Sequence, residues 1–509
     1  MTTTHSTLRF AFAGIVVLAS LSTVCAQKKP AFPEDQLNQS EYSADLRFLA
    51  SDELMGRMTG SPWNDVASRF VAEQFRAAGI AAFRGMDDYF QMVPLERTFP
   101  PGEAEVTFLG DTLRQGKEML TRSGGPLDWR GEYVYVGYGL VDPASHADPY
   151  SGIDVKGKVV IAKFGAEKMS SRFAGFTGLA EQKRAGASAH GAVALIELYR
   201  GSFPWRSLTT FLTRSGYDLA AGEDFPHFLI EDTSSAYTKK VEAKTGGPLG
   251  IRSKGLRKEP IHARNVIGFI KGTDPKLRDE YILLTAHYDH IGTGRAAGSS
   301  TDTIFNGARD NAFGTVALIA AAKSFATQPP KRSVIIAAVT GEEIGEFGSR
   351  YLSSNLPVPA NQVVFDLNTD GAGYDDTTIV TVIGLERTTA ESAIRQGSER
   401  YGLKAIRDPV PEQHLFDRSD NANFARLGIP APNYSAGLRA FGPEILKYYH
   451  KVADQADDSL NFSYFTRFCK AYVHSARMIA DMKQKPFWRS GDEYERAGKA
   501  LYNTETKPR

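Results

Sequence analysis

The sequence predicts an α/β fold: a mixed, largely parallel sheet flanked by helices, with an inserted, mostly β segment. Two observations carry this prediction. After residue 262, apolar β-branched stretches alternate with helical ones, an order typical of parallel strands covered by helices. Between about 105 and 258, short β-rich runs are instead separated by clusters of Gly, Pro, Asp and Ser. A chain of 509 residues is long enough for two or three domains.

Composition narrows the classes of function. The chain is 42% hydrophobic and 23% charged, as in ordinary globular proteins. Its net charge of +1 gives no indication of a nucleic-acid partner or of strong attraction to an anionic membrane. The basic stretch at 252–258 is interpreted as a solvated loop. Beyond the N-terminal region, no segment reaches the length of a transmembrane helix.

The N-terminal residues have the pattern of a secretory signal peptide. Arg9 precedes a short apolar run, and small residues follow it up to Ala26. We therefore predict a signal peptide over 1–26, cleaved after Ala26, and a secreted or periplasmic protein. Lipidation of Cys25 is the alternative, disfavoured because a Val directly precedes it. After cleavage Cys469 is the only cysteine, so no intrachain disulfide is expected.

The elements are expected in the following order. A helix over 42–50 is followed by a glycine-punctuated loop and then by an amphipathic helix over 65–78, which ends at Gly79. The inserted segment comes next. Buried strands and one long helix then follow, at NVIGFI (265–270), YILLTAH (281–287), GTVALIAAAKSFAT (314–327, the helix), SVIIAAVT (333–340) and QVVFDLNT (362–369). We assign 27–104 and 259–509 to one domain and 105–258 to the insert.

Histidine and carboxylate residues gather where these elements begin or end. They are His287, Asp289 and His290 after one strand, Asp310 before the long helix, Glu342 and Glu343 after the next strand, Asp370 after another, and His450 near the C-terminus. Because parallel sheets bind ligands beyond the carboxyl ends of their strands, these residues are expected at one edge.

This combination suits a pair of zinc ions. Zinc binds imidazole nitrogen and carboxylate oxygen, and two ions about 3.5–4 Å apart can share a carboxylate. A further carboxylate must stay off the metal to accept a proton, and the adjacent Glu342 and Glu343 can divide these tasks because consecutive side chains diverge. Alone, Asp310 is an ordinary helix N-cap and His287 part of a loop cluster; their combination in this order favours the metal site.

The motifs resemble one known family. The stretches LASDELMGR, LLTAHYDHIG, NGARDNAFGT, TGEEIGEFGSRYL, LNTD, RSDNANFARLGIPA and YHKVADQADD are similar to those of co-catalytic di-zinc aminopeptidases, the relatives of bacterial leucyl aminopeptidases and glutamate carboxypeptidase. The resemblance covers about 43–94 and 262–480. It implies a zinc exopeptidase-like fold, and the insert resembles a protease-associated domain.

The resemblance also implies the metal ligands, with two zinc ions per chain. His287 and Asp370 bind one ion, Glu343 and His450 bind the other, and Asp310 bridges both. The implied activity is that of an aminopeptidase, which removes N-terminal residues from peptides with a free N-terminus through a metal-bridged hydroxide.

Further roles are implied around the ligands. Glu342 is the general base, and Asp289 orients His287. Asp454 and Asp420 contact the ligands without binding the metal. Three positions depart from the family pattern and affect the expected specificity. Arg309 places a positive charge beside the metals, Phe313 narrows the pocket, and Asn421 replaces a common histidine.

Other functions remain open from the sequence. A carboxypeptidase acting on acidic dipeptides needs a basic pocket, and a glutaminyl cyclase uses a single zinc ion and usually lacks an insert. An inactive binding scaffold is the alternative from a different class, although such relatives lose ligands or the base. The sequence assigns neither the oligomeric state nor the preferred substrate side chain.

Overall fold

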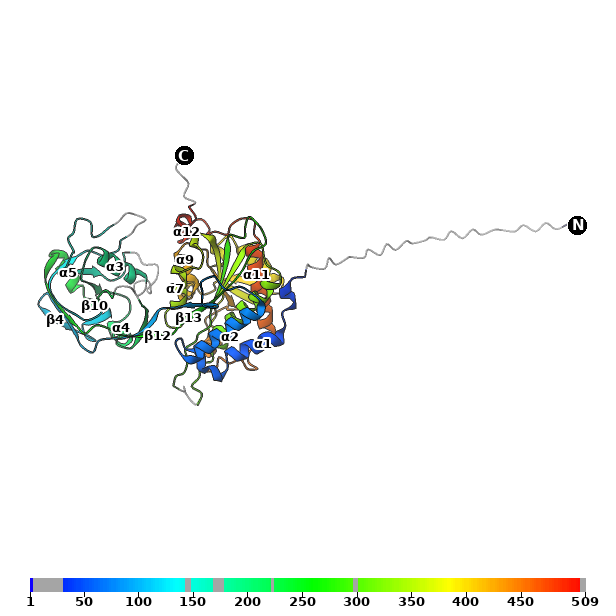
Figure 1. Cartoon of the computed structure of the whole chain (residues 1–509), viewed down its shortest axis with the longest axis horizontal. Helices are drawn as coiled ribbons and strands as arrows, with labels where there is room; N and C mark the ends of the chain where they lie inside the picture. The colour runs from blue at the N-terminus through cyan, green and yellow to red at the C-terminus, as the bar shows by residue number, and fades with distance from the viewer. Residues whose placement is uncertain (3–30, 142–147, 168–177, 221–223, 296–300, 504–509) are drawn as a thin grey trace, which may run out of the picture.

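The computed structural model describes residues 1–2, 31–141, 148–167, 178–220, 224–295 and 301–503. The predicted signal peptide lies outside the described residues, apart from its first two. Two lobes are visible in Figure 1, and the smaller one holds the segment between β3 and β11. The larger lobe is formed by the chain before and after it.

An eight-stranded sheet is the centre of the larger lobe, in the order β1-β13-β15-β14-β16-β19-β17-β18. Its strands are β1 Phe90–Met92, β13 Arg264–Ile270, β14 Tyr281–His287, β15 Ser333–Val339, β16 Val363–Asn368, β17 Ile379–Ile383, β18 Lys404–Arg407 and β19 Asn433–Ala436. Four of the seven neighbouring pairs are parallel. The predicted mixed, largely parallel α/β sheet is confirmed, although β13 runs antiparallel to β15.

Helices cover both faces of this sheet, which explains why its strands are apolar throughout. In β14, Leu284 faces the helices α1, α2, α6 and α11, whereas Leu283 faces α7, α9 and α12. The helices are α1 Gln39–Leu49, α2 Pro62–Ala78, α6 Phe313–Thr327, α7 Phe347–Ser354, α8 Glu391–Glu399, α9 Asn421–Arg426, α10 Pro443–Tyr448, α11 Phe462–Ala480 and α12 Glu495–Leu501.

Two predicted helices show how local sequence sets helix ends. Helix α2 starts three residues before the predicted residue 65, because the Ser61 side chain caps it and Pro62 occupies the first turn. It ends where predicted, at Gly79 in the left-handed conformation (φ 78°). Helix α6 matches its prediction to within one residue and is buried on nearly every side between the sheet and α11.

Short helical turns connect several of these elements. They are η1 Pro33–Gln36, η2 Asp52–Arg57, η4 Ala308–Ala312, η5 Ala360–Gln362, η6 Leu385–Arg387, η7 Pro411–Gln413 and η8 Leu415–Arg418. Of these, η2 lies in the stretch predicted as a glycine-punctuated loop.

The smaller lobe has its own eight-stranded sheet and its own core. Its strands, in spatial order, are β4 Asp111–Arg114, β3 Ala104–Phe108, β11 Gly246–Ser253, β6 Leu127–Tyr135, β7 Val159–Lys163, β8 Ala194–Tyr199, β10 His227–Glu231 and β5 Met119–Ser123, and its helices are α3 Gly178–Ala189, α4 Trp205–Leu212 and α5 Ala236–Ala243. Strand β6 ends at Tyr135, ahead of the turn glycines Gly137 and Gly139. The domain limits at 105 and 258 stay predictions.

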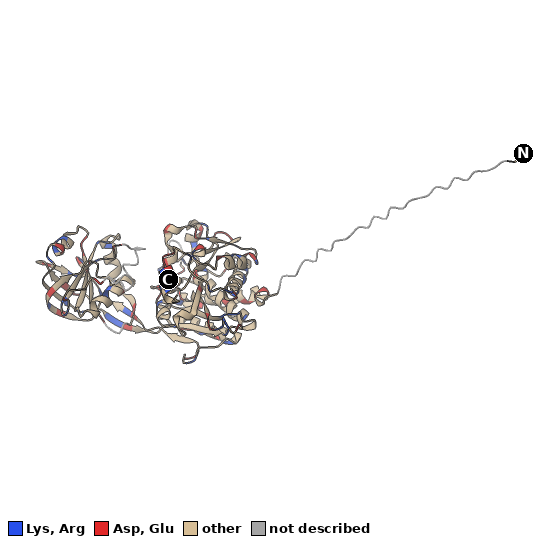
Figure 2. Cartoon of the chain, turned by 90° about the horizontal axis from the view of Figure 1, so that it is seen from above, with Lys and Arg blue, Asp and Glu red and all other residues tan. Residues whose placement is uncertain are grey.

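A small third sheet pairs a strand before the insert with one at its end and with one strand from within it. It contains β2 Leu95–Phe99, β9 Gly216–Leu219 and β12 Arg257–Ile261. Lys, Arg, Asp and Glu are scattered over both lobes, as the near-zero net charge suggests (Figure 2). None of the helices in the described part of the chain is both long enough and apolar enough to cross a membrane.

Candidate metal centre

Three neighbouring strands deliver the predicted site residues to one edge of the central sheet. Strand β14 lies between β15 and β16 and is parallel to both, so their carboxyl ends meet. His287 is the last residue of β14, Glu342 and Glu343 follow β15, and Asp370 follows β16. The sequence prediction of a shared edge is therefore met by the topology.

Asp310 reaches the same edge from an irregular turn rather than from a regular helix end. It lies within η4, directly before α6, with extended dihedral angles (φ −118°, ψ 93°) and a cis peptide bond to Asn311. The Asn311 amide donates to the carbonyl of Thr369 at 2.9 Å, beside Asp370. Gly314 has to be glycine, because a Cβ there would lie 2.5 Å from the same carbonyl oxygen. The turn is thus held against the end of β16.

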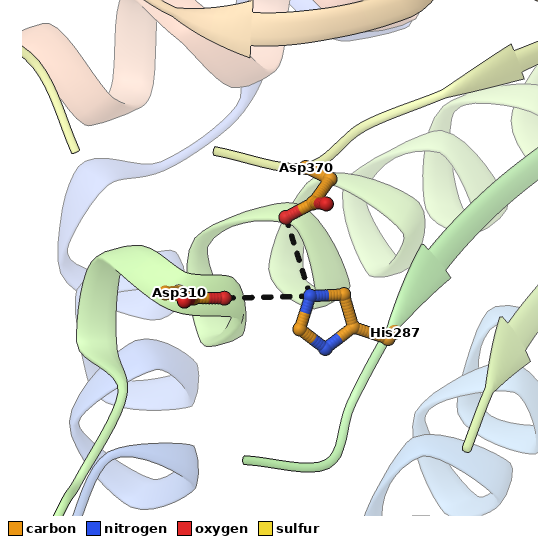
Figure 3. Close-up of side chains that lie close together, drawn as sticks. All are labelled: His287, Asp310 and Asp370. Atoms are coloured by element: carbon orange, nitrogen blue, oxygen red, sulfur yellow. Dashed lines mark hydrogen bonds and ion pairs between the residues drawn. The ribbon is translucent and has the colours of Figure 1, made fainter. Parts of the chain in front are cut away.

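The first cluster consists of His287, Asp310 and Asp370 (Figure 3). Nε2 of His287 lies 3.2 Å from Oδ1 of Asp370 and 3.4 Å from Oδ1 of Asp310. Ser419 donates to the other oxygen of Asp370 at 2.6 Å. One imidazole nitrogen and two carboxylates therefore converge on one point.

The second cluster uses the other oxygen of Asp310. Nε2 of His450 lies 3.3 Å from Oδ2 of Asp310 and 3.0 Å from Oε2 of Glu343. Asp310 therefore lies between the two clusters and faces each with a different oxygen. This arrangement is what a carboxylate shared by two cations requires.

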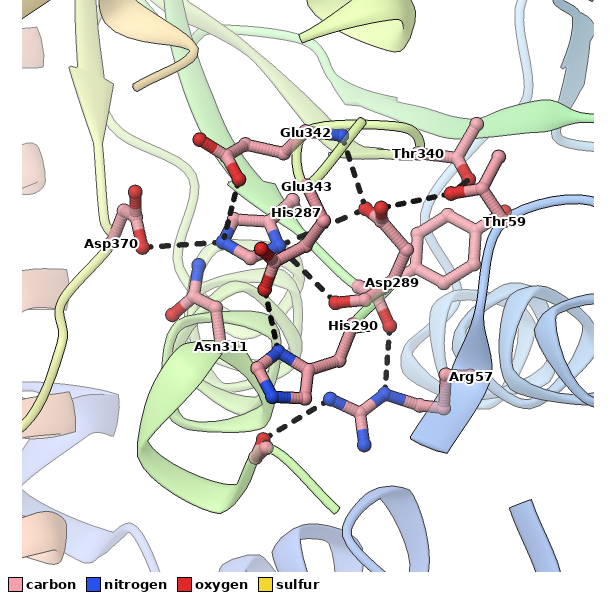
Figure 4. A network of polar contacts seen from close by, with 12 residues as sticks. Arg57, Thr59, His287, Asp289, His290, Asn311, Thr340, Glu342, Glu343 and Asp370 are labelled. Atoms are coloured by element: carbon pink, nitrogen blue, oxygen red, sulfur yellow. Dashed lines mark hydrogen bonds and ion pairs between the residues drawn. The ribbon is translucent and has the colours of Figure 1, made fainter. Parts of the chain in front are cut away.

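Glu342 and Glu343 diverge as predicted for consecutive residues. Glu343 faces His450, whereas Glu342 lies on the side of His287, with Oε2 3.9 Å from Nε2 (Figure 4). Burial and the carboxylates of Asp370 and Glu343 raise the pKa of Glu342 well above that of an ordinary glutamate. Glu342 thus lies beside His287 but belongs to neither of the two clusters described above.

Asp289 supports the site in two ways. Its backbone carbonyl lies 3.2 Å from Nδ1 of His287, closer than its carboxylate, which is at 3.7 Å. The carboxylate accepts hydrogen bonds from the Thr59 hydroxyl at 2.8 Å and from the backbone N–H of Glu342 at 3.3 Å. Asp289 is therefore in place to orient His287, but its carboxylate also fixes the backbone of Glu342.

Electrostatics of the clusters favour bound cations. Burial opposes charge on His450, but its contacts with Asp310 and Glu343 raise its pKa to about 10. Asp370 and Glu342 raise the pKa of His287 in the same way, against the effect of burial. Carboxylates outnumber imidazoles here, and both donor types are those that zinc binds. The residues present therefore fit a site for divalent cations.

The structure shows that the positive charge of Arg309 has a carboxylate partner. Nη1 of its guanidinium lies 3.0 Å from the Asp454 carboxylate. The same group stacks on Tyr448, 3.7 Å from the centre of the ring. Asp454 also accepts from the backbone N–H groups of Arg309 and Asp310, at 3.0 and 3.1 Å. The added positive charge is therefore compensated within the turn, and Asp454 holds Asp310 in place.

Phe313 also lies elsewhere than expected, and Asn421 makes its hydrogen bonds away from the clusters. Phe313 does not narrow the pocket, because it is buried against Phe465 and Phe468 of α11. The side-chain amide of Asn421 donates to the carbonyls of Phe416 and Ala431, inside the core. Among the described residues, Ser419 rather than the neighbouring Asp420 makes the hydrogen bond to Asp370.

Sequence reasoning assigned no role to His290 or Arg57. Nδ1 of His290 lies 2.5 Å from Oε1 of Glu343, and the His290 ring is buried. Arg57 is buried beside the same loops (Figure 4). Both occur in motifs already noted, HYDH and LASDELMGR, but neither motif reveals which atoms its side chains contact.

A pocket opens onto the clusters, and its walls differ in character. The acidic wall contains Asp310, Glu342 and Asp370, and the cation Arg418 lies nearby with Nη2 3.4 Å from the Tyr449 hydroxyl. The apolar wall is formed by Ile383, Leu415, Leu438 and Phe441.

Comparison with known proteins agrees with this geometry. Residues 265–473 match peptidase family M28. The similarity to this family extends over that part of the chain, which includes the predicted ligands from His287 to His450. A probable zinc metalloprotease of Leptosphaeria maculans is 32% identical over 114 residues, which are 22% of this chain and 25% of that protein. The aminopeptidase YwaD of Bacillus subtilis is 24% identical over 305 residues, 55% of this chain and 61% of the relative.

The solved structures found include an aminopeptidase from Aneurinibacillus sp. strain AM-1, with a TM-score of 0.49 and 18% identity over 87% of this chain and 94% of the other. The chain spans only about a quarter of the length of the fungal relative. The predicted resemblance to a metallopeptidase family is confirmed over residues 265–473. The protease-associated identity of the insert and the roles of the individual site residues stay predictions.

Proposed function

We propose that this protein is a zinc-dependent aminopeptidase with two ions per chain. The observation that carries the proposal is the position of Asp310, whose two oxygens face different clusters 3.4 Å from His287 and 3.3 Å from His450. The zinc metalloprotease and aminopeptidase names of the relatives support the choice of metal and reaction.

In this proposal, each ion is held by the histidine and carboxylate side chains of one cluster. His287 and Asp370 would hold one ion, Glu343 and His450 would hold the other, and Asp310 would contact both. Zinc ions bound there supply Lewis-acid polarisation of a scissile carbonyl and lower the pKa of water.

Glu342 has the position of a proton carrier. It lines the pocket and is in neither ligand set, so it is free to accept a proton from the attacking water and to donate it to the leaving amine. Cations in the centre would favour the charged form of Glu342 and counteract the rise in its pKa that burial causes.

The pocket walls support action at a free N-terminus. An ammonium group entering the pocket meets the carboxylates of Asp370 and Glu342, and these would stabilise its charge. The apolar wall is suited to an aliphatic or aromatic first side chain. Cleavage would then be confined to the N-terminal residue of a peptide.

The test combines metal analysis with matched substrates. We expect about two zinc ions per chain by elemental analysis, and hydrolysis of aminoacyl substrates that stops with chelator. Glu342→Gln should retain both ions and lose about 100- to 10,000-fold in kcat. N-acetylation of the substrate should abolish cleavage. A single ion would instead favour a glutaminyl cyclase, and full metal loading without turnover would favour an inactive binding scaffold.

A carboxypeptidase that acts on acidic dipeptides is a second candidate, favoured by one observation. Arg418 lines the pocket and, among the described residues, forms no ion pair with a carboxylate. A guanidinium in this position is suited to binding a substrate carboxylate. Cleavage of N-acetylated acidic dipeptides, with a KM raised by Arg418→Gln, would replace the aminopeptidase proposal.

We also propose that the protein is exported and that residues 105–258 form a protease-associated domain. The charged residue, apolar run and small residues that end at Ala26 support export. Mass spectrometry of protein purified from a secreting host should find Gln27 as the first residue. An intact N-terminus in an exported form would contradict the cleavage site, and a lipid on Cys25 would support the lipoprotein alternative.

A further inference from the structure

Arg57 is a buried cation that makes its hydrogen bonds to the backbone. It ends η2, and only 1% of its surface is exposed. Its guanidinium donates to Tyr288 O at 2.8 Å, to Asn306 O at 2.6 Å, to Gly307 O at 3.1 Å and to Leu49 O. Among the described residues no carboxylate forms an ion pair with it. The contacts of Arg57 are therefore with chain segments rather than with a counter-ion.

Three of the four acceptors belong to the two loops that carry ligands, and the fourth, Leu49, is the last residue of α1. Tyr288 follows His287 directly, and Asn306 and Gly307 come just before Asp310. One planar group thus connects the loop after β14 with the turn before α6. These are the two segments whose relative position sets the 3.4 Å distance between His287 and Asp310.

The backbone around Arg57 strengthens this connection. The Gly292 N–H donates to the carbonyl of Gly56 at 3.1 Å, so η2 is also hydrogen-bonded to the far end of the loop after β14. On the other side Gly307 has a positive φ of 57°, and a Cβ there would lie 2.3 Å from Asp310 O and 2.5 Å from the His290 ring. The segments leave little room for a shift that would compensate for a lost contact.

Arginine has the geometry that this connection needs. Buried carbonyls need donors, and an unpaired one is costly. Guanidinium offers five N–H donors in a rigid plane and reaches carbonyls in separate segments at once. Lysine places three donors on one atom and cannot span the same acceptors. Burial lowers the pKa of Arg57 to about 10, opposed by Asp289 and Asp454, so it stays charged at neutral pH.

We propose that Arg57 is a positioning residue, which sets the spacing of the two ligand-bearing loops and through it the affinity of the centre for divalent cations. The proposal rests on the metal centre of the proposed function. It concerns only Arg57, which binds no metal itself. Partners outside the ligand set typically contribute 10- to 100-fold to metal affinity, and we expect an effect of about that size.

The chain offers a matched control in Arg332. This residue is also 1% exposed, donates to Glu280 at 2.7 Å and to the carbonyls of Ala480 and Met482. It lies directly before β15, at the opposite end of that strand from Glu342. Replacing it by lysine disturbs a buried arginine of the same lobe without disturbing the loops of the metal centre.

The test compares Arg57→Lys with Arg332→Lys in the full chain. Zinc dissociation constants are measured by competition with a chromophoric chelator, and the Tm of the metal-free protein is measured separately. We expect Arg57→Lys to weaken zinc binding about 10- to 100-fold, and Arg332→Lys to lower Tm with zinc affinity unchanged. Wild-type zinc affinity in Arg57→Lys overturns the proposal. A wild-type chain that binds no zinc overturns the proposed function instead.

A second measurement covers the case in which Arg57→Lys does not fold. Hydrogen exchange is followed on the wild-type chain with and without zinc. If Arg57 couples the loops, zinc should slow exchange in residues 49–57 together with the loops at 287–292 and 304–310. Protection confined to the ligand loops, with 49–57 unaffected, overturns the proposal.

Discussion

Two buried groups of histidine and carboxylate side chains lie in different lobes, and they differ in how their charge is balanced. In the smaller lobe Glu197 contacts Lys183 at 2.6 Å and His227 at 2.9 Å, and all three side chains are buried. In the larger lobe four carboxylates, of Asp310, Glu342, Glu343 and Asp370, contact three imidazoles, of His287, His290 and His450.

This difference in charge balance indicates which of the two groups needs a bound cation to neutralise its carboxylates. The single carboxylate of Glu197 already has a lysine, and its pKa falls to about 2 because Lys183 and His227 outweigh the effect of burial. The metal centre has more negative charge than its own side chains can neutralise. A buried acidic excess is costly unless ions compensate it. The predictions below test this contrast, beginning with the largest effect.

Removing the shared carboxylate should have the largest effect. Asp310→Asn takes a charged ligand from both clusters, so we expect loss of peptidase activity and more than 100-fold weaker zinc binding. This effect on affinity exceeds the one typical of residues that contact the ligands without binding the metal. The control is Asp366→Asn. Burial raises the pKa of Asp366 well above the ordinary value, which disfavours the charged form, and an amide has nearly the same shape as a carboxyl group. Equal loss in both variants would contradict the assignment of Asp310.

Neutralising Glu197 should damage stability and leave the centre intact. Glu197→Gln leaves Lys183 buried without its counter-charge, and such a change costs about 3–5 kcal/mol. Urea unfolding measures the loss, and chelator competition should show unchanged zinc affinity. A large drop in affinity would mean that the two groups are coupled.

Metal removal should destabilise the larger lobe and leave the smaller lobe unchanged, which is the reverse of the effect expected for Glu197→Gln. Zinc that binds only the folded state contributes about 4 kcal/mol at a concentration 1,000 times its Kd. Chelation should therefore speed hydrogen exchange in β14 and α6 and leave exchange in β8 and β10 unchanged. Faster exchange in β8 would show that the smaller lobe also depends on metal.

Acid should weaken the smaller lobe first. Burial lowers the pKa of His227 to about 4 in the folded state, against an ordinary value of 6.5. Between these values the unfolded chain binds the extra proton, so stability falls as the pH decreases from 6.5 to 4. The shift corresponds to about 3 kcal/mol. Unfolding followed by exchange in β10 should show this slope, and His227→Gln should remove it.

The smallest effect is expected when both charges of the ion pair are removed. The double variant Lys183→Met with Glu197→Met replaces the pair by apolar groups, a change that is often close to neutral. We expect its free energy of unfolding within about 1 kcal/mol of the wild type. The corresponding removal of His287 and Asp370 should still abolish zinc binding. A strongly destabilised double variant would show that the pair does more than balance charge.

Much of the central sheet was predictable because its strands are buried on both faces. The stretches around β14, β15 and β16 are apolar throughout, and the polar residues that end them mark the shared edge. The antiparallel direction of β13 was not predictable, because apolar periodicity carries no information on strand direction.

The sequence predicted which residues gather at this edge of the sheet, but it did not predict the contacts they make. Helix start signals placed Asp310 correctly, but its irregular turn depends on Asp454, 144 residues away. Arg309 and Phe313 were expected to act on the pocket. Their side chains instead turn to Asp454 and to α11, because partners distant in sequence were available.

By itself, the sequence determined the α/β class, the strands whose ends meet and the identity of the His and acidic residues there, since these follow from local periodicity and residue chemistry. Only the tertiary structure decided which oxygen of Asp310 faces which histidine, and that Arg57 connects the two loops. Those facts depend on contacts between segments up to 250 residues apart, and no local pattern encodes them.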